Sequence, residues 1–168
     1  MTMFRLSAVL AATLLLASTH AHAASPAGVE LSTRTTLNLG AAKAIVAAAE
    51  AEARRQNLRV TVVVVDDAGR PILLQRMDGT PNSSVEVASA KARHAIDYRR
   101  DTVFHQDLLE KNALAVLALP DSLPIEGGVM LKHGEEVIGA IGVSGAASSK
   151  DGEIARAGAA VLTAVRVE

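Results

Sequence analysis

The stretch between Glu126 and Gly145 constrains the fold more than any other part of the chain. It predicts two short strands, Val129–Lys132 and Val137–Val143, joined by a tight turn at His133-Gly134. A turn of this length with glycine at its second position forces an antiparallel hairpin. The second strand and its end also carry three glycines at intervals of three residues, namely Gly139, Gly142 and Gly145. Because glycine weakens a strand unless a ligand or another backbone comes close, these glycines indicate a close approach.

A second hairpin is predicted upstream of the first. The β-branched run Arg59–Val65 forms one strand, and Ile72–Met77 returns as the other. The intervening segment Asp66–Pro71 has the composition of a turn. Two hairpins of this kind predict one antiparallel sheet.

Helices are predicted around the two hairpins. Their expected spans are 35–57, 84–99, 102–111 and 150–165, and residues 114–119 are expected to form a fifth strand or a buried helical end. Capping residues are predicted at Thr35 or Thr36, at Ser83 with Glu86, and at Ser148 with Asp151. The order α-ββ-α(α)-ββ-α predicts an α+β domain whose antiparallel sheet carries packed helices.

The N-terminus has the pattern of a secretory signal. Arg5 precedes the apolar run Leu6–Ala17, and Ala21-His22-Ala23 follows it. The apolar run is too short to span a bilayer comfortably. We therefore predict cleavage after Ala23, export of the mature protein to a periplasm, and no membrane span thereafter; an uncleaved anchor is the alternative. Residues 24–34 are then a flexible lead-in, and residues 35–168 form a single domain.

Composition excludes several classes of function. The chain has no tryptophan, one tyrosine and two phenylalanines, and its formal net charge is −1. Nucleic-acid binding through stacked bases or a basic surface is therefore not expected. The absence of cysteine excludes disulfides, cysteine-ligated iron–sulfur clusters and a thiol nucleophile.

The second predicted helix carries the main candidate binding residues. Lys91, His94 and Tyr98 share one face, and imidazole both titrates near neutrality and binds iron. His94 is the first candidate iron ligand, and His105 is the second. Lys91 and Arg93 could pair with the carboxylates of a ligand. A solvated polar helix face has the same composition, so that alternative stays open.

Other candidates lie in the loops that follow the strands. Gly127-Gly128 could expose backbone N–H groups to a carboxylate, although a simple chain bend explains this pair equally well. Met77 could supply part of an apolar slot, and Asp78 could handle protons. Ser144 lies close to a nucleophile-elbow pattern, but no histidine follows it, so a serine hydrolase is not expected.

These motifs together resemble the GlcG/HbpS family of haem-degrading domain proteins, which includes the C-terminal domain of PduO-type cobalamin adenosyltransferases. The resemblance spans about Leu37 to Val165, with Val129 where the family usually has proline. Its motifs are Val64-Val65-Asp66 through Gly69, Arg76-Met77-Asp78-Gly79, Lys91-Ala92-Arg93, Leu119-Pro120 through Pro124, Glu126-Gly127-Gly128, and Val137 through Gly145 with Asp151 beyond.

The resemblance implies a compact α+β subunit that assembles into homo-oligomers. Some family members bind haem, and an exported member degrades it and is an accessory partner of a sensor kinase. The first hypothesis is therefore an exported haem- or tetrapyrrole-binding protein, with or without haem-degrading or iron-handling activity. The alternatives are an enzyme or binding protein for a small carboxylic or hydroxy acid, and a structural or signalling accessory oligomer.

Overall fold

A computed structural model describes residues 32–164 of the chain, and residues 34–164 lie in one compact unit. The predicted signal sequence, residues 1–23, lies outside the described residues. Within residues 32–164, none of the helices has the length and apolar character needed to cross a membrane.

The sheet consists of the two predicted hairpins. Its strands are β1 (Thr61–Asp66), β2 (Pro71–Arg76), β3 (Gly128–His133) and β4 (Glu136–Ser144), in the order β2-β1-β4-β3. Every neighbouring pair is antiparallel, and β1 joins β4 in the middle of the sheet. The predicted α+β class and antiparallel sheet are confirmed.

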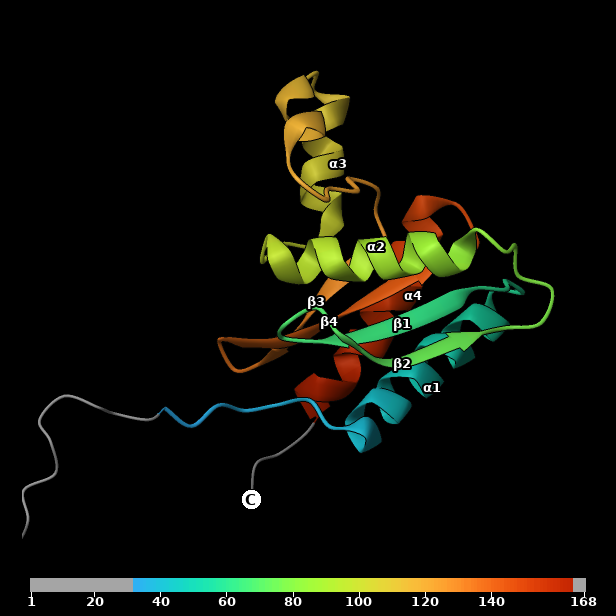
Figure 1. Cartoon of the computed structure of the whole chain (residues 1–168). Coiled ribbons are helices and arrows are strands. Elements are labelled where there is room, and N and C mark those ends of the chain that lie inside the picture. The colour runs from blue at the N-terminus through green and yellow to red at the C-terminus, as the bar shows by residue number, and fades with distance from the viewer. Residues whose placement is uncertain (1–31, 165–168) are drawn as a thin grey trace, which may run out of the picture. The chain divides into compact units, whose positions relative to one another are not determined.

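Helices cover both faces of this sheet. They are α1 (Leu39–Arg55), α2 (Ser84–Asp97), α3 (Thr102–Glu110) and α4 (Ser148–Ala159), with short 3-10 helices η1 (Leu114–Ala118) and η2 (Ala160–Ala164). One face packs on α2, and the other packs on α1 and α4 (Figure 1). The helix α3 extends away from the layer formed by α2 (Figure 1).

The continuous valine run of β1 is explained by this two-sided packing. Val62 and Val64 belong to the core cluster of α1 and α4, whereas Val63 and Val65 pack with the alanines of α2. Successive side chains of a strand point to opposite faces, so a strand covered on both sides needs apolar residues at every position.

The close approach predicted from the glycines of β4 is confirmed, and the approaching group is backbone. A Cβ atom built on Gly142 would lie 2.0 Å from the carbonyl oxygen of Ala88, on α2. A Cβ on Gly139 would lie 2.4 Å from the carbonyl oxygen of Val65, and one on Gly145 would lie 2.4 Å from that of Arg59. The glycines therefore let α2 and the neighbouring strand pack closely on β4.

The predicted caps are wrong at three helix starts. The side chain of Asn38 caps α1 by accepting a hydrogen bond from the N–H of Ala41 at 2.8 Å, so α1 begins later than Thr35 or Thr36 would require. Ser83 has helical dihedral angles and makes no side-chain cap, and α4 follows Ala147 without a side-chain cap.

Of the two alternatives for residues 114–119, the strand is wrong; the segment is helical, but most of it is not buried. Residues 114–118 form η1, in which Leu114 and Leu117 are 64% and 65% exposed. Phe104 of α3 and Ile125, beyond η1, are exposed as well. An apolar surface thus extends over α3 and the segment that follows it, where a homo-oligomer of the predicted kind would have apolar area to bury.

Candidate functional site

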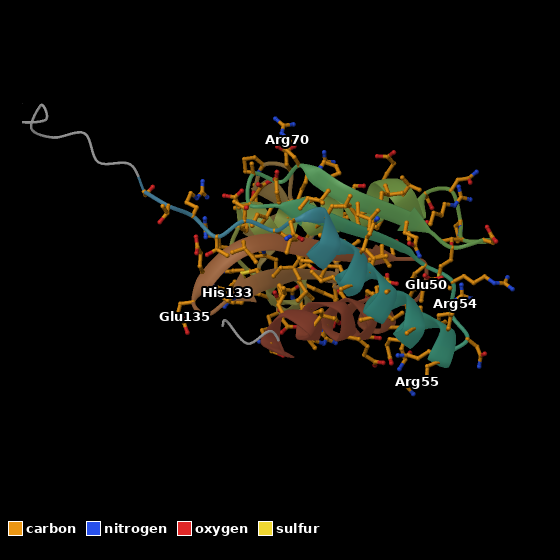
Figure 2. The ribbon with its side chains drawn as sticks, turned by 90° about the horizontal axis from the view of Figure 1, so that it is seen from below. Glu50, Arg54, Arg55, Arg70, His133 and Glu135 are labelled. Atoms are coloured by element: carbon orange, nitrogen blue, oxygen red, sulfur yellow. The ribbon has the colours of Figure 1, made fainter. Side chains whose placement is uncertain are left out.

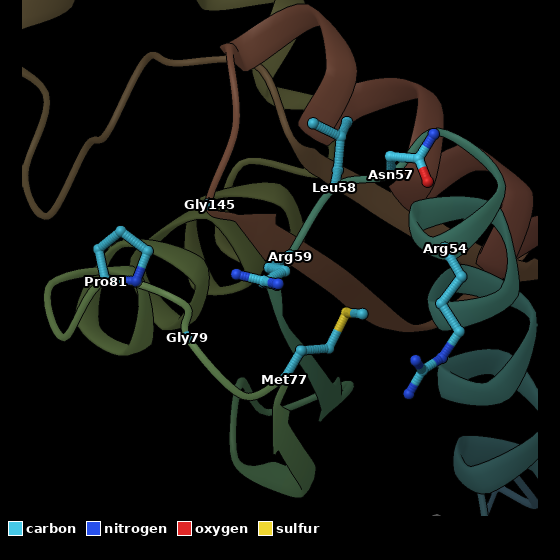
Figure 3. A pocket seen from close by; sticks show the side chains of 8 residues that line it. All are labelled: Arg54, Asn57, Leu58, Arg59, Met77, Gly79, Pro81 and Gly145. Carbon is cyan, nitrogen blue, oxygen red and sulfur yellow. The ribbon is translucent and has the colours of Figure 1, made fainter.

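An open pocket lies where α1 ends, β1 begins and β2 ends (Figure 3). We call it the Arg59 pocket. Its volume is about 640 Å³, and its lining residues are Arg54, Asn57, Leu58, Arg59, Met77, Gly79, Pro81 and Gly145. A smaller hollow of about 330 Å³ shares four of these residues and adds Asp78.

One wall of the Arg59 pocket is the C-terminus of α1. Asn57 has a φ of 55°, and its N–H donates to the carbonyl oxygen of Arg54 at 3.0 Å. The N–H of Leu58 donates to the carbonyl oxygen of Ala53 at 2.9 Å. These two bonds form a Schellman motif, in which asparagine tolerates the left-handed conformation. The motif ends the helix sharply and directs Leu58 and Arg59 toward the start of β1.

The opposite wall is the turn that follows β2. The N–H of Met77 donates to the carbonyl oxygen of Val60 at 3.1 Å. The N–H of Thr80 donates to the carbonyl oxygen of Met77 at 3.2 Å and closes the turn. Gly79 supplies a φ of 77° at the third position of this turn, where glycine is favoured. A Cβ on Gly79 would come within 3.1 Å of the Arg59 guanidinium. The missing side chain therefore leaves room for this guanidinium against the turn.

The two arginines of the pocket differ in their partners. The Arg54 guanidinium is 2.5 Å from the carboxylate of Glu50, which lies one helical turn earlier on α1. Figure 2 shows these two side chains together near the end of α1, with Arg55 pointing to a different side. Within residues 32–164, the guanidinium of Arg59 has neither an ion-pair nor a hydrogen-bond partner. Of the two arginines that line this pocket, Arg59 is therefore the one whose guanidinium is available to an anionic ligand.

Apolar groups lie between and beside these charges. In Figure 3 the thioether of Met77 rises between the side chains of Arg54 and Arg59. Leu58 and Pro81 line the same pocket. The arrangement suits a ligand that has carboxylates at one edge and an apolar body.

His94 and His105 form a buried pair away from this pocket. His94 is fully buried on α2, and its Nε2 is 2.7 Å from Nδ1 of His105 on α3. The backbone N–H of Leu123 donates to Nδ1 of His94 at 2.9 Å. Nδ1 is therefore an acceptor and Nε2 carries the proton of the neutral ring. Both ring nitrogens of His94 are engaged within the chain, which leaves neither for iron in this arrangement.

Burial also keeps this pair uncharged. Desolvation, together with the neighbouring His105, lowers the pKa of His94 to about 4. Desolvation and the charge of Arg100 lower the pKa of His105. The pair is consequently neutral at neutral pH and joins α2 to α3 and to the segment after η1.

Lys91 is held in a buried ion pair. Its ammonium lies 2.8 Å from the Asp151 carboxylate of α4 and 3.1 Å from the carbonyl oxygen of Val143. The second Asp151 oxygen accepts from the N–H of Ala146 at 3.0 Å. Lys91 and Asp151 are 1% and 2% exposed. This ammonium stabilises the junction of α2, β4 and α4, and it has no free surface for a ligand carboxylate.

Gly127 and Gly128 are used for packing. The N–H of Gly128 donates to the Thr102 hydroxyl at 2.9 Å, and a Cβ on Gly128 would lie 2.2 Å from the carbonyl oxygen of Lys91.

Arg93 is exposed and lies elsewhere, in a hollow of about 450 Å³ that Asp97 and Asp121 also line. The structure therefore separates Arg93 from Met77 and Asp78.

Residues 37–160 match the model of a known family, described as "Haem degrading protein HbpS-like". The chain belongs to the HbpS-like family. Protein GlcG of Escherichia coli K12 is 35% identical over 114 residues, which cover 68% of this chain and 85% of GlcG.

Solved structures of HbpS-like proteins have the same fold. A double mutant of HbpS from Streptomyces reticuli is 32% identical, with a TM-score of 0.72, and the match covers 83% of this chain and 98% of that one. The PduOC–haem complex is 24% identical, with a TM-score of 0.68, covering 80% of this chain and 98% of that one. At that identity the second likeness shows the fold alone.

Among the predicted site residues of this HbpS-like chain, the structure brings Met77 and Asp78 together at adjoining hollows. Sequence reasoning missed Arg54 and Arg59 as candidate binding residues. The predicted first hairpin could have indicated the position of Arg59, because in an antiparallel pair the start of one strand lies beside the end of the other. Thr61 pairs with Arg76, so the residues just before β1 face those just after β2.

Proposed function

We propose that this protein is an exported haem-binding protein and that haem binds in the Arg59 pocket. The observation that carries the proposal is the Arg59 guanidinium, which has no partner among residues 32–164 and lies beside the Met77 thioether in an open pocket. The description of the matching family model, which names haem degradation, supports the choice of ligand.

The residues of the Arg59 pocket fit the chemistry of haem. Its propionates would accept charge-assisted hydrogen bonds from Arg59 and, in competition with Glu50, from Arg54. Leu58, Met77 and Pro81 would contact the porphyrin face. Bound haem would supply a redox-active iron, while the residues of this chain would bind and orient the ring.

The decisive measurement is a titration of the purified protein with haemin, followed by the Soret band. Replacing Arg59 by alanine is expected to weaken binding about tenfold, because a charge-assisted bond to a propionate is lost. The matched control is Arg55→Ala: Arg55, the last residue of α1, is exposed like Arg59 but pairs with Glu52 and does not line the pocket.

The results of this titration distinguish whether the protein binds haem from whether haem binds in the Arg59 pocket. Saturable binding that Arg59→Ala weakens and Arg55→Ala leaves unchanged would support the proposal. Saturable binding that is unaffected by Arg59→Ala would place haem elsewhere. If no saturation occurs at micromolar haemin, the haem-binding proposal fails.

Export is proposed from the sequence pattern of residues 1–23. The expected product is a chain beginning at Ala24, because the A-x-A site precedes it. The intact mass of protein recovered from the periplasmic fraction of an expressing bacterium checks this prediction. A periplasmic protein that retains residues 1–23, or recovery in the cytosolic fraction alone, would contradict it.

A further inference from the structure

We propose that the Arg59 pocket recognises tetrapyrroles by their carboxylate edge and apolar ring face rather than by iron. Iron-free dicarboxylate porphyrins are then ligands of this pocket on equal terms with haem. This inference rests on the proposed haem function and specifies the ligand class of the same pocket.

The charged groups of the pocket can hold carboxylates but cannot coordinate a metal. A guanidinium stays protonated and offers only N–H donors, so Arg54 and Arg59 have no lone pair for iron. The Arg59 guanidinium has no ion-pair or hydrogen-bond partner within residues 32–164, whereas that of Arg54 forms an ion pair with Glu50. The strongest single contact available to a tetrapyrrole is therefore the contact between a propionate and Arg59, and it is the same with or without iron.

The imidazoles of the described chain lie away from this pocket. His94 uses both ring nitrogens, one with His105 and one with the N–H of Leu123. His105 is 7% exposed and packs edge-on against the His94 ring. His133 lies at the end of β3, at the other end of the sheet from Arg54 (Figure 2). None of the three lines the Arg59 pocket.

Two side chains near the pocket have atoms that iron could accept as ligands. The Met77 thioether is a soft, weak donor, and the Asp78 carboxylate is exposed at the adjoining hollow, where water solvates it. We expect both to add less to affinity than the propionate contacts do. Met77 then acts mainly as an apolar wall, a role that leucine can also fill.

The test compares three probes on the same purified protein: haemin, protoporphyrin IX and protoporphyrin IX dimethyl ester. Haemin binding is followed by its Soret band, and the iron-free probes are followed by their own fluorescence. Protoporphyrin IX is expected to bind within about threefold of haemin, and the ester about tenfold more weakly than the free acid. Arg59→Ala is expected to weaken haemin and protoporphyrin IX by similar factors, and Arg55→Ala to weaken neither.

Variants at the two potential iron ligands complete the test. Met77→Leu and Asp78→Asn are each expected to change haemin affinity by less than about twofold. The inference is overturned if protoporphyrin IX binds more than tenfold more weakly than haemin, or if either variant selectively weakens haemin. In those cases haem binding that depends on Arg59 still supports the proposed function. That function fails separately if haemin does not bind at all.

Discussion

Replacing Lys91 by methionine is expected to lower the free energy of unfolding by about 3 to 5 kcal/mol, although the two side chains have similar length and volume. The cost arises because Asp151 then keeps a buried carboxylate without its cation. Desolvation already raises the pKa of Asp151, and Lys91 opposes that rise. Urea unfolding followed by far-ultraviolet circular dichroism measures the effect, since the chain has no tryptophan for fluorescence.

An exposed lysine on α4 provides the matched control. Lys150 lies 2.8 Å from Glu153, but these side chains are 47% and 43% exposed. Solvent screens such a pair, so Lys150→Met is expected to change the free energy of unfolding by less than about 1 kcal/mol.

A double variant separates the lost cation from the lost packing. Adding Asp151→Asn to Lys91→Met removes the unpaired carboxylate and is expected to restore much of the stability. If the double variant is no more stable than Lys91→Met, the cost comes from packing and not from the buried charge. A folded Lys91→Met protein that binds haemin with unchanged affinity would further assign Lys91 to the fold and not to ligand binding.

The hairpins could be predicted because their signals are local. The Asp66 carboxylate accepts from the N–H groups of Ala68 and Arg70, which is the turn chemistry that the sequence indicates. The β-branched run before it supplies the central strand. The N-terminal caps were less predictable, because a cap depends on backbone angles as well as on residue type. Ser83 has a φ of −61° and a ψ of −21°, and its side chain does not cap the helix.

The candidate site was harder to predict because its contacts join distant elements. Helical spacing places Lys91, His94 and Tyr98 on one face but does not show what covers that face. Asp151 reaches Lys91 from 60 residues away, and the N–H of Leu123 reaches His94 from 29 residues away. A polar helix face that resembles a ligand site in the sequence is therefore satisfied internally. The position of Arg59 beside the turn after β2 becomes visible only when the strand register is known.

His94 is expected to make the protein less stable as the pH falls from 7 to 5. The imidazole has a pKa of about 4 in the folded chain, below its ordinary value of 6.5. Between these values the unfolded chain binds a proton that the folded chain does not bind. The contribution of His94 to stability is therefore complete above about pH 6.5 and declines as the pH falls toward 4. For this one group, the free energy of unfolding is expected to fall by about 2 kcal/mol between pH 7 and pH 5.

Urea unfolding at pH 7, 6 and 5 measures this slope, with His94→Gln and His133→Gln compared with the parent protein. His94→Gln is expected to flatten the slope, whereas His133→Gln, at the end of β3, is expected to retain it. NMR titration of the imidazole resonances in the parent protein tests the same point if His94→Gln does not fold. A His94 resonance that titrates near pH 6.5, or equal stability at pH 7 and pH 5, would contradict the prediction.

The same proton would alter the segment that follows η1. A protonated His94 carries N–H groups on both ring nitrogens, so Nδ1 can no longer accept from the N–H of Leu123. If both rings are cationic, Nε2 of His94 and Nδ1 of His105 also cannot remain 2.7 Å apart at low energetic cost. Acid should therefore loosen residues 119–125 before it unfolds the sheet, and amide hydrogen exchange should detect this first at Leu123. The Arg59 pocket lies on other elements and should keep its geometry at the same pH.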